Sequence, residues 1–175
     1  MSIKVVFLDR DGVINEEVGY LHKIEDFKFI DGVMESCNYI QSLGFQIIVI
    51  TNQSGIARGK YREEDFHEVN KWMLDKFQKE NVRILDVFFC PHVQEDNCLC
   101  RKPKPGLLIN AKEKYDINMT NSWMIGDKEA DIEAANNAGI GNTILVRSGH
   151  EIDEKNTNAT HIFDSILEAI TIFKK

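Results

Sequence analysis

Proline is scarce in this chain, with 3 residues in 175, and no apolar run is longer than about ten residues. So few prolines argue against long disordered linkers. The short apolar runs exclude a membrane-spanning helix, and Asp9 interrupts the N-terminal run before the apolar region of a signal peptide could form. We therefore expect a cytoplasmic protein.

Basic residues are also in deficit. Lys and Arg number 21 against 28 Asp and Glu, which leaves a formal net charge of −7. Nucleic acids and anionic membranes both favour a basic surface, so neither is expected as a partner. A phosphorylated small molecule would need a local cationic pocket within this acidic protein.

The length and composition are those of one globular domain. Hydrophobic residues make up 43% of the chain and charged residues 28%. A chain of this size buries roughly 70% of its unfolded surface, which is enough for a core of its own. We expect a single domain over residues 1–175 and, by default, a monomer.

Strand-like and helix-like segments alternate along the chain. Apolar runs typical of buried strands occupy residues 3–8, 45–50, 84–89, 122–125, 143–146 and 161–163, and helix-like segments occupy 33–43, 63–80, 106–115 and 129–138. A last helix is expected after Ser165, which has the spacing of a capping box with Glu168. The alternation predicts an α/β fold, a three-layer Rossmann-like parallel sheet with helices on both faces.

Polar side chains suited to chemistry follow these strands one after another. They are Asp9 and Asp11 after the first strand, Thr51 and Asn52 after the second, three cysteines after the third, and Asp127 and Lys128 after the fourth. The carboxyl ends of parallel strands lie on one edge of the sheet, where open α/β folds bind their ligands. We expect these residues to meet in one crevice.

Asp9 and Asp11 are the strongest part of this pattern, because both carboxylates can face one small volume. Mg²⁺ takes one or two carboxylates together with water and phosphate oxygens, and Asp127 could complete such a site with Asp9 and the Asp11 backbone. One carboxylate could also be a nucleophile and the other a general acid and base. Asp131 could reach the metal through water or only cap a helix. Alone, the Asp-x-Asp-Gly motif could equally be an ordinary turn.

Cationic and hydrogen-bonding side chains near these strand ends could hold a phosphoryl group. Thr51 and Asn52 supply a hydroxyl and an amide, and Lys128 adds a positive charge. The basic run 101–104 would by itself more often be solvated surface. It directly follows Cys100, however, so a metal-bound loop could hold Arg101 and Lys102 in place.

The loop over residues 90–100 carries three thiols and one imidazole, from Cys90, His92, Cys98 and Cys100. This is a complete ligand set for a closed, structural Zn²⁺ site, and in a reducing compartment clustered cysteines point to a metal rather than to disulfides. The alternative is a loop with free thiols. Cys37 lies on the inner side of a predicted helix and is expected to be a core residue.

Together these motifs resemble those of the haloacid-dehalogenase-like phosphatases. The shared features are Asp9-x-Asp11-Gly12, the Thr after the second strand, the Lys ahead of a late helix, and Gly126-Asp127-x-x-x-Asp131. Within that superfamily the longer motifs are similar to those of the D-glycero-D-manno-heptose 1,7-bisphosphate 7-phosphatases, and they comprise 17–20, 29–33, 51–60, 90–92, 98–103 and 126–128. The resemblance implies a fold without a large cap domain, Mg²⁺, a structural zinc loop and a bacterial heptose pathway that supplies lipopolysaccharide, capsule or S-layer sugars.

The resemblance also implies roles for individual residues. Asp9 would be the nucleophile, Asp11 the proton donor and Asp127 a further metal ligand, while Thr51 and Lys102 would hold the phosphoryl group. Substrate contacts would come from Glu17, Val18, Gly19, Tyr20, Thr51, Asn52, Gln53, Ser54, Arg101, Lys102 and Lys128. From their positions in an otherwise acidic protein, Arg58, Lys60 and Arg101 are expected to meet the phosphate that remains at C1.

We therefore predict a Mg²⁺-dependent phosphatase that removes the C7 phosphate of the heptose bisphosphate through a phospho-aspartate. A histidinol-phosphate phosphatase, or a phosphatase of another small phosphomonoester, is the alternative enzyme. An alternative of another class is a zinc-stabilised module that binds phosphorylated ligands without turnover. The second aspartate argues against that module, because binding alone needs no proton donor.

Overall fold

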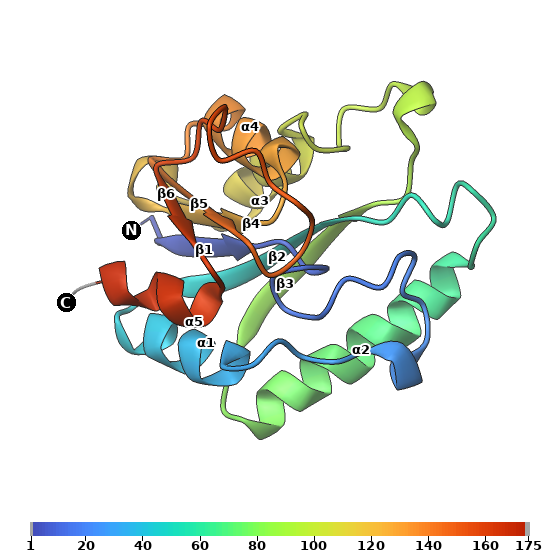
Figure 1. Ribbon diagram of the computed structural model, residues 1–175, viewed down its shortest axis with the longest axis horizontal. Coiled ribbons are helices and arrows are strands. Elements are labelled where there is room, and N and C mark those ends of the chain that lie inside the picture. The colour runs from blue at the N-terminus through green and yellow to red at the C-terminus, as the bar shows by residue number, and fades with distance from the viewer. Residues whose placement is uncertain (1, 174–175) are drawn as a thin grey trace.

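The computed structural model describes residues 2–173, in which a six-stranded parallel sheet has helices on both faces (Figure 1). The strands are β1 (Val5–Leu8), β2 (Gln46–Asn52), β3 (Ile84–Cys90), β4 (Trp123–Gly126), β5 (Asn142–Val146) and β6 (His161–Phe163). The helices are α1 (Val33–Ser42), α2 (Glu63–Lys79), α3 (Gly106–Tyr115), α4 (Glu129–Asn137) and α5 (Ile166–Ala169), with 3-10 turns at Ile24–Asp26, Gln94–Asp96, Met119–Asn121 and Ile170–Ile172. The predicted three-layer α/β fold is confirmed.

The order of the strands creates the crevice in which the site lies. The sheet runs β3-β2-β1-β4-β5-β6, so β1 lies between β2, which follows it in the chain, and β4, which comes much later. Neighbouring connections leave the sheet in opposite directions at such a switch point, which opens a crevice at the carboxyl ends of the strands. The last residues of β1, β2 and β4 border it.

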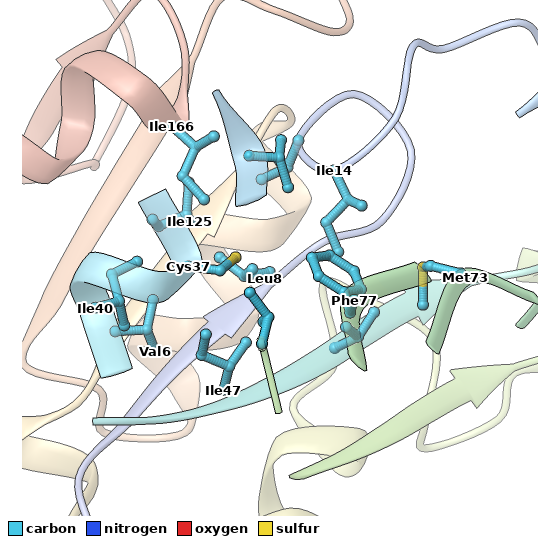
Figure 2. Packing of buried hydrophobic residues seen from close by; sticks show 14 of the residues in the cluster. Val6, Leu8, Ile14, Cys37, Ile40, Ile47, Met73, Phe77, Ile125 and Ile166 are labelled. Carbon is cyan, nitrogen blue, oxygen red and sulfur yellow. The ribbon is translucent and has the colours of Figure 1, made fainter. Parts of the chain in front are cut away.

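The hydrophobic core has two parts, one on each face of the sheet. In β1, Val6 and Leu8 belong to the cluster under α1, α2 and α5 (Figure 2), whereas Val5 and Phe7 belong to the cluster under α3 and α4. The two groups of helices lie on opposite faces of the sheet (Figure 1). All four side chains are fully buried, because successive side chains of a strand point to opposite faces and both faces are covered. Cys37 lies in the first cluster, as predicted, and burial raises the pKa of its thiol to about 12.

Strand ends differ by one or two residues from the prediction, and one difference affects the site. β2 continues past its apolar run because Thr51 and Asn52 still pair with Phe89 and Cys90 of β3. Thr51 and Asn52 are therefore the last residues of a strand rather than the first residues of a loop. The ladder holds their backbones fixed at the crevice.

The capping box predicted for the last helix is wrong. Ser165 is the N-cap of α5 but its side chain makes no capping hydrogen bond. The carboxylate of Glu168 reaches one residue further back and accepts the backbone N–H of Asp164 at 2.6 Å. No helix within residues 2–173 is both long and apolar enough to cross a membrane.

Candidate active site

Asp9 and Asp11 lie in a tight turn at the end of β1. The N–H of Asp9 donates to the carbonyl of Ile125 in β4, so the turn starts from a position that the sheet fixes. Gly12 has a φ of +90°, and a Cβ there would collide with the carboxylate of Asp127. Only glycine combines this backbone conformation with so close an approach.

Three carboxylates gather at the inner end of the crevice. One oxygen from each of Asp9, Asp127 and Asp131 lies within 4.8 Å of the others. Asp127 is fully buried, and its Oδ1 has no hydrogen-bond partner within residues 2–173. Its Oδ2 accepts from the backbone N–H of His150 at 3.0 Å and lies 2.6 Å from Nδ1 of the same residue. A buried carboxylate oxygen without a donor is costly unless a cation neutralises it, so Oδ1 fits a metal ligand.

The charge state of Asp9 shows the same need for a cation. Burial raises the pKa of Asp9 well above its ordinary value, and the carboxylates of Asp131 and Asp127 raise it further, while Lys102 acts in the opposite direction. A divalent cation reverses such an effect because it becomes the largest local charge. The cluster therefore fits Mg²⁺ in charge and in ligand type.

Lys102 connects two of these carboxylates. Its Nζ lies 2.9 Å from Oδ1 of Asp9 and 2.6 Å from Oδ1 of Asp131, and it donates to the carbonyl of Ile50 at 2.9 Å. Burial alone would lower the pKa of Lys102, but the two carboxylates outweigh it and raise that pKa, so the ammonium stays charged. Asn52 fixes the backbone of Lys102, with Nδ2 donating to its carbonyl and Oδ1 accepting its N–H.

Asp131 caps α4 as well as pairing with Lys102. Its Oδ2 accepts the backbone N–H groups of Asp127 and Lys128, each at 3.1 Å. Of the two roles that the sequence left open, helix capping is therefore present. The pairing with Lys102 is a further role that the sequence did not indicate.

The carboxylate of Asp11 lies apart from the acidic cluster and is held by three donors. Its Oδ1 accepts from Arg10 Nη2 at 2.9 Å and from Asn15 Nδ2 at 3.0 Å, and its Oδ2 accepts from Gln53 Nε2 at 3.3 Å. Burial would raise the pKa of Asp11, but the charge of Arg10 and these hydrogen bonds outweigh it, so the pKa is lowered. The side chain of Asp11 is thus oriented toward the crevice rather than toward the metal cluster.

A hollow of about 370 Å³ leads from the solvent toward these aspartates. The predicted substrate residues that line it are Glu17, Gly19, Tyr20, Asn52, Gln53, Ser54, Arg58, Arg101 and Lys128. An adjoining space of about 80 Å³ reaches Asp9 and Lys102. Val18 does not line the hollow, and its side chain is 54% exposed. Thr51 is fully buried and does not line the hollow.

The hydroxyl of Thr51 accepts a hydrogen bond from Gln53 Nε2 at 2.9 Å, whereas its own proton has only a distant acceptor, the carbonyl of Asn52 at 3.5 Å. Among the described residues, the proton therefore has no close acceptor. Lys60 is also outside the hollow, with its Nζ 5.9 Å from the centre of the Tyr20 ring.

Cys90, His92, Cys98 and Cys100 converge in the loop after β3, with their ligand atoms within 4.8 Å of one another. Around a tetrahedral Zn²⁺ with bonds of about 2.3 Å to sulfur and 2.0–2.1 Å to nitrogen, ligand atoms would be about 3.5–3.8 Å apart. Cys98 Sγ lies 3.6 Å from Cys90 Sγ and 3.5 Å from Cys100 Sγ, and His92 Nδ1 lies 3.6 and 3.4 Å from the sulfurs of Cys90 and Cys100. The 3.4 Å distance is slightly shorter than this range, and the Cys90–Cys100 pair, at 2.8 Å, is much closer. The donor set fits zinc, and a bound ion would move the sulfurs of Cys90 and Cys100 apart.

Three residues of this site were not found from the sequence. His150 follows β5 and lines the hollow, yet no local pattern marks it, and only its place at a fifth strand end could have indicated it. Tyr61 lines the hollow beside the loop after β2. Arg10 stands between the two aspartates, and its guanidinium is buried over the ring of Phe66.

The fold and this arrangement of carboxylates, Thr51 and Lys102 define a haloacid-dehalogenase-like hydrolase. In agreement, the family model described as HAD-hydrolase-like matches residues 99–169. The chain is 46% identical over 165 residues to a D-glycero-alpha-D-manno-heptose-1,7-bisphosphate 7-phosphatase of Photorhabdus laumondii, covering 90% of each chain. It is 39% identical to the D-glycero-beta-D-manno-heptose-1,7-bisphosphate 7-phosphatase of Escherichia coli K12, covering 99% of this chain and 95% of the relative.

A solved structure agrees with these relatives. The D,D-heptose 1,7-bisphosphate phosphatase of B. bronchiseptica, in complex with magnesium and phosphate, superposes with a TM-score of 0.86 at 25% identity and covers 97% of each chain. The chain belongs to the family of heptose-1,7-bisphosphate 7-phosphatases.

Proposed function

We propose that this protein is a Mg²⁺-dependent phosphatase that removes the C7 phosphate of D-glycero-D-manno-heptose 1,7-bisphosphate through a phospho-aspartate at Asp9. One observation carries the proposal. Asp9 lies at the inner end of a hollow, beside the buried Lys102 and beside a carboxylate oxygen of Asp127 that has no partner. The sugar in this proposal is the one that the names of the relatives at 39–46% identity give.

Asp9 and Asp127, with the backbone of Asp11, would hold the Mg²⁺. When bound, the ion supplies positive charge to the oxygens of the phosphoryl group. Oδ1 of Asp127 supports this assignment, because it is buried and has no hydrogen-bond partner among the described residues. Asp131 is a poorer ligand, since Lys102 and two backbone N–H groups already occupy its oxygens.

Phosphoryl transfer would proceed in two steps. A carboxylate oxygen of Asp9 forms a bond to phosphorus while the bond from phosphorus to the C7 oxygen breaks, and Asp11, whose protonated form the negative charge of the bound phosphate favours, gives its proton to that oxygen. Asp11, now ionised, takes a proton from the water that attacks the acyl phosphate, which releases inorganic phosphate and restores Asp9. Lys102 and the hydroxyl of Thr51 stabilise the charge on the phosphoryl oxygens in both steps.

We also propose a structural zinc ion held by Cys90, His92, Cys98 and Cys100. All four positions of a tetrahedral site would be filled, so this ion would activate no water. Its effect would be to fix Arg101, whose backbone N–H donates to Cys98 Sγ at 3.4 Å and whose Nη1 donates to the carbonyl of His92 at 3.3 Å.

The charge of the hollow favours a bisphosphate over histidinol phosphate. With the C7 phosphate at Asp9, the C1 phosphate would extend into the hollow, which Arg58, Arg101 and Lys128 line. The ammonium group of histidinol phosphate would meet the same cations and be repelled, so like charges would weigh against the wrong substrate.

Four further expectations from the sequence stay predictions. They are the single domain over 1–175, the monomeric state, the cytoplasmic location and the absence of nucleic-acid or membrane partners.

The test is phosphate release from heptose 1,7-bisphosphate and from histidinol phosphate, measured in parallel with Mg²⁺ and with a chelator. We expect Mg²⁺-dependent turnover, a higher kcat/KM for the bisphosphate, and heptose 1-phosphate as the product in phosphorus NMR. A higher kcat/KM for histidinol phosphate, or release of the C1 phosphate first, would overturn the proposal.

A further inference from the structure

The side chain of Gln53 is used entirely inside the protein, although it borders the hollow. Its Nε2 donates to Oδ2 of Asp11 at 3.3 Å and to Oγ1 of Thr51 at 2.9 Å, and its Oε1 accepts from the hydroxyl of Tyr61 at 2.5 Å. Only 3% of the residue is exposed. An amide NH₂ has two protons to donate, and both have acceptors here. Gln53 therefore has no donor left for a substrate.

The hydroxyl of Tyr61 helps to fix the direction in which this amide faces. Oδ2 of Asp11 and Oγ1 of Thr51 both accept hydrogen bonds from this amide, so its nitrogen faces them and its oxygen faces Tyr61. The phenol of Tyr61 completes that arrangement because its proton goes to Oε1. Without the hydroxyl, Oε1 would lose its hydrogen bond, and only the bonds of Nε2 to Asp11 and Thr51 would hold the amide in this orientation.

Two packing contacts restrict the position of the Tyr61 ring. Tyr61 is 7% exposed, and its ring stacks on that of His22 with centroids 5.2 Å apart and planes 6° apart. The ring also lies so close to Gly55 that a Cβ on that residue would collide with it. A ring confined in this way places its hydroxyl at one point.

The hydrogen bonds on Asp11 identify the oxygen that transfers the proton. Each carboxylate oxygen has about two lone-pair positions. Arg10 and Asn15 fill both positions on Oδ1, whereas Gln53 fills one on Oδ2. The free lone pair on Oδ2 is the one that can carry the proton, and the Gln53 donor sets its direction.

We propose that Gln53 and Tyr61 are positioning residues for proton transfer, with the Tyr61 hydroxyl fixing the Gln53 amide and the amide aiming Oδ2 of Asp11 at the leaving oxygen. This inference rests on the proposed function, because it needs Asp11 to be the acid. It gives Gln53 a different task from the substrate contact that the family resemblance implies. Neither residue gains or loses a proton in the reaction.

The dependence of the rate on the leaving group separates positioning from substrate binding. A sugar alkoxide leaves only with a proton, whereas a dinitrophenolate leaves without one. If Asp11 is positioned less precisely, phosphoryl transfer from esters with poor leaving groups should slow, whereas transfer from esters with good leaving groups should not. The ratio kcat/KM reports the transfer to Asp9 and is not affected by the later hydrolysis, which is common to all substrates.

The experiment compares Tyr61→Phe, Gln53→Met and the double variant with the unchanged protein. The substrates are heptose 1,7-bisphosphate, phenyl phosphate, 4-nitrophenyl phosphate and 2,4-dinitrophenyl phosphate. Tyr115→Phe is the matched control, since it removes a phenol hydroxyl that donates to Asp86 at 2.8 Å, away from the hollow. Binding of heptose bisphosphate is measured by calorimetry with each substitution placed in an Asp9→Asn background.

We expect kcat/KM for heptose bisphosphate to fall about 10-fold in Tyr61→Phe and about 100-fold in Gln53→Met, while the dinitrophenyl ester changes by less than about twofold. The double variant should be no slower than Gln53→Met, because the two residues act in series. The binding constant should not change, and Tyr115→Phe should match the unchanged protein.

Three results would overturn the inference while leaving the proposed function intact. They are an equal loss for every leaving group, a loss that appears as weaker binding of the bisphosphate, and no loss in Tyr61→Phe. If Gln53→Met does not fold, Tyr61→Phe decides the matter alone, since it removes a single oxygen atom. An unchanged protein that releases no phosphate from heptose bisphosphate would instead refute the proposed function, and this inference with it.

Discussion

The Nζ of Lys102 lies 2.9 Å from Oδ1 of Asp9, although 93 residues separate the two in the chain. The pair is buried, and the same ammonium group also meets Asp131 at 2.6 Å. A buried charge is tolerated when it is paired and hydrogen-bonded. The contact therefore joins the stability of the fold to the chemistry of the site.

Replacing Lys102 by Met should show both effects. The change leaves Asp9 and Asp131 without their counter-charge, so we expect a loss of about 3–5 kcal/mol in the free energy of unfolding and no measurable turnover. Mg²⁺ should restore part of the lost Tm, because it brings positive charge to the same carboxylates. Lys114→Met is the control, since its ion pair with Asp86 is near the surface, and we expect it to cost much less than Lys102→Met in urea unfolding. Equal losses in the two variants would contradict the account.

His150 should act through Asp127. Its ring nitrogen Nδ1 lies 2.6 Å from Oδ2 and leaves Oδ1 free for the metal. Removing such a partner of a metal ligand typically weakens metal binding 10–100-fold. We expect His150→Ala to raise the half-saturating Mg²⁺ concentration by about 10-fold, both in turnover and in the Mg²⁺-induced shift of Tm. His161→Ala, on β6, should leave both values unchanged. An unchanged Mg²⁺ requirement in His150→Ala would exclude this role.

Zinc should be found in protein purified without chelator, at one ion per chain by metal analysis. Cys98→Ser should lower the zinc content and the Tm and weaken turnover, because Arg101 and then Lys102 lose their anchor. Cys37→Ala is the control, since Cys37 lies in the hydrophobic core and should not affect the zinc content. Absence of zinc from the unchanged protein would refute the ligand assignment. Loss of zinc with no change in Tm or KM would refute only the anchoring role.

Arg58 and Arg101, which line the hollow, should recognise the phosphate that is not cleaved. Arg58→Ala and Arg101→Ala remove charges that line the hollow, and we expect each to raise KM for the 1,7-bisphosphate by about 10-fold. KM for heptose 7-phosphate, which lacks the C1 phosphate, should change little. Lys71→Ala, on the exposed face of α2, serves as the control. An equal rise in KM for both substrates would place the C1 phosphate elsewhere.

The sequence was sufficient to predict the fold and the edge of the sheet at which the site lies. Apolar runs buried on both faces marked the strands, and Asp9 and Asp127 followed two of them, so their meeting depended only on parallel topology. The proposed nucleophile and metal ligands were therefore accessible to local patterns. The pairing of Lys102 with Asp131 was not, because it depends on how a long loop packs against α4.

His150 and Tyr61 show a second limit. His150 reaches Asp127 because β5 pairs with β4, which lets Gly149 pass close to Gly12 and the carboxylate. Tyr61 reaches Gln53 because the intervening loop turns back on itself through hydrogen bonds such as that from the N–H of Lys60 to the carbonyl of Gly55. Neither residue lies in a motif, so only the three-dimensional arrangement reveals it.

The central claim is that phosphate passes through Asp9, and the most direct measurement is mass spectrometry of protein quenched in acid during turnover of heptose 1,7-bisphosphate with Mg²⁺. We predict a phosphoryl group on the peptide that contains Asp9, its absence in Asp9→Asn together with loss of phosphate release, and a fall in turnover of about 10²–10⁴-fold in Asp11→Asn. Phosphate release by folded Asp9→Asn at a rate near that of the unchanged protein would contradict the account.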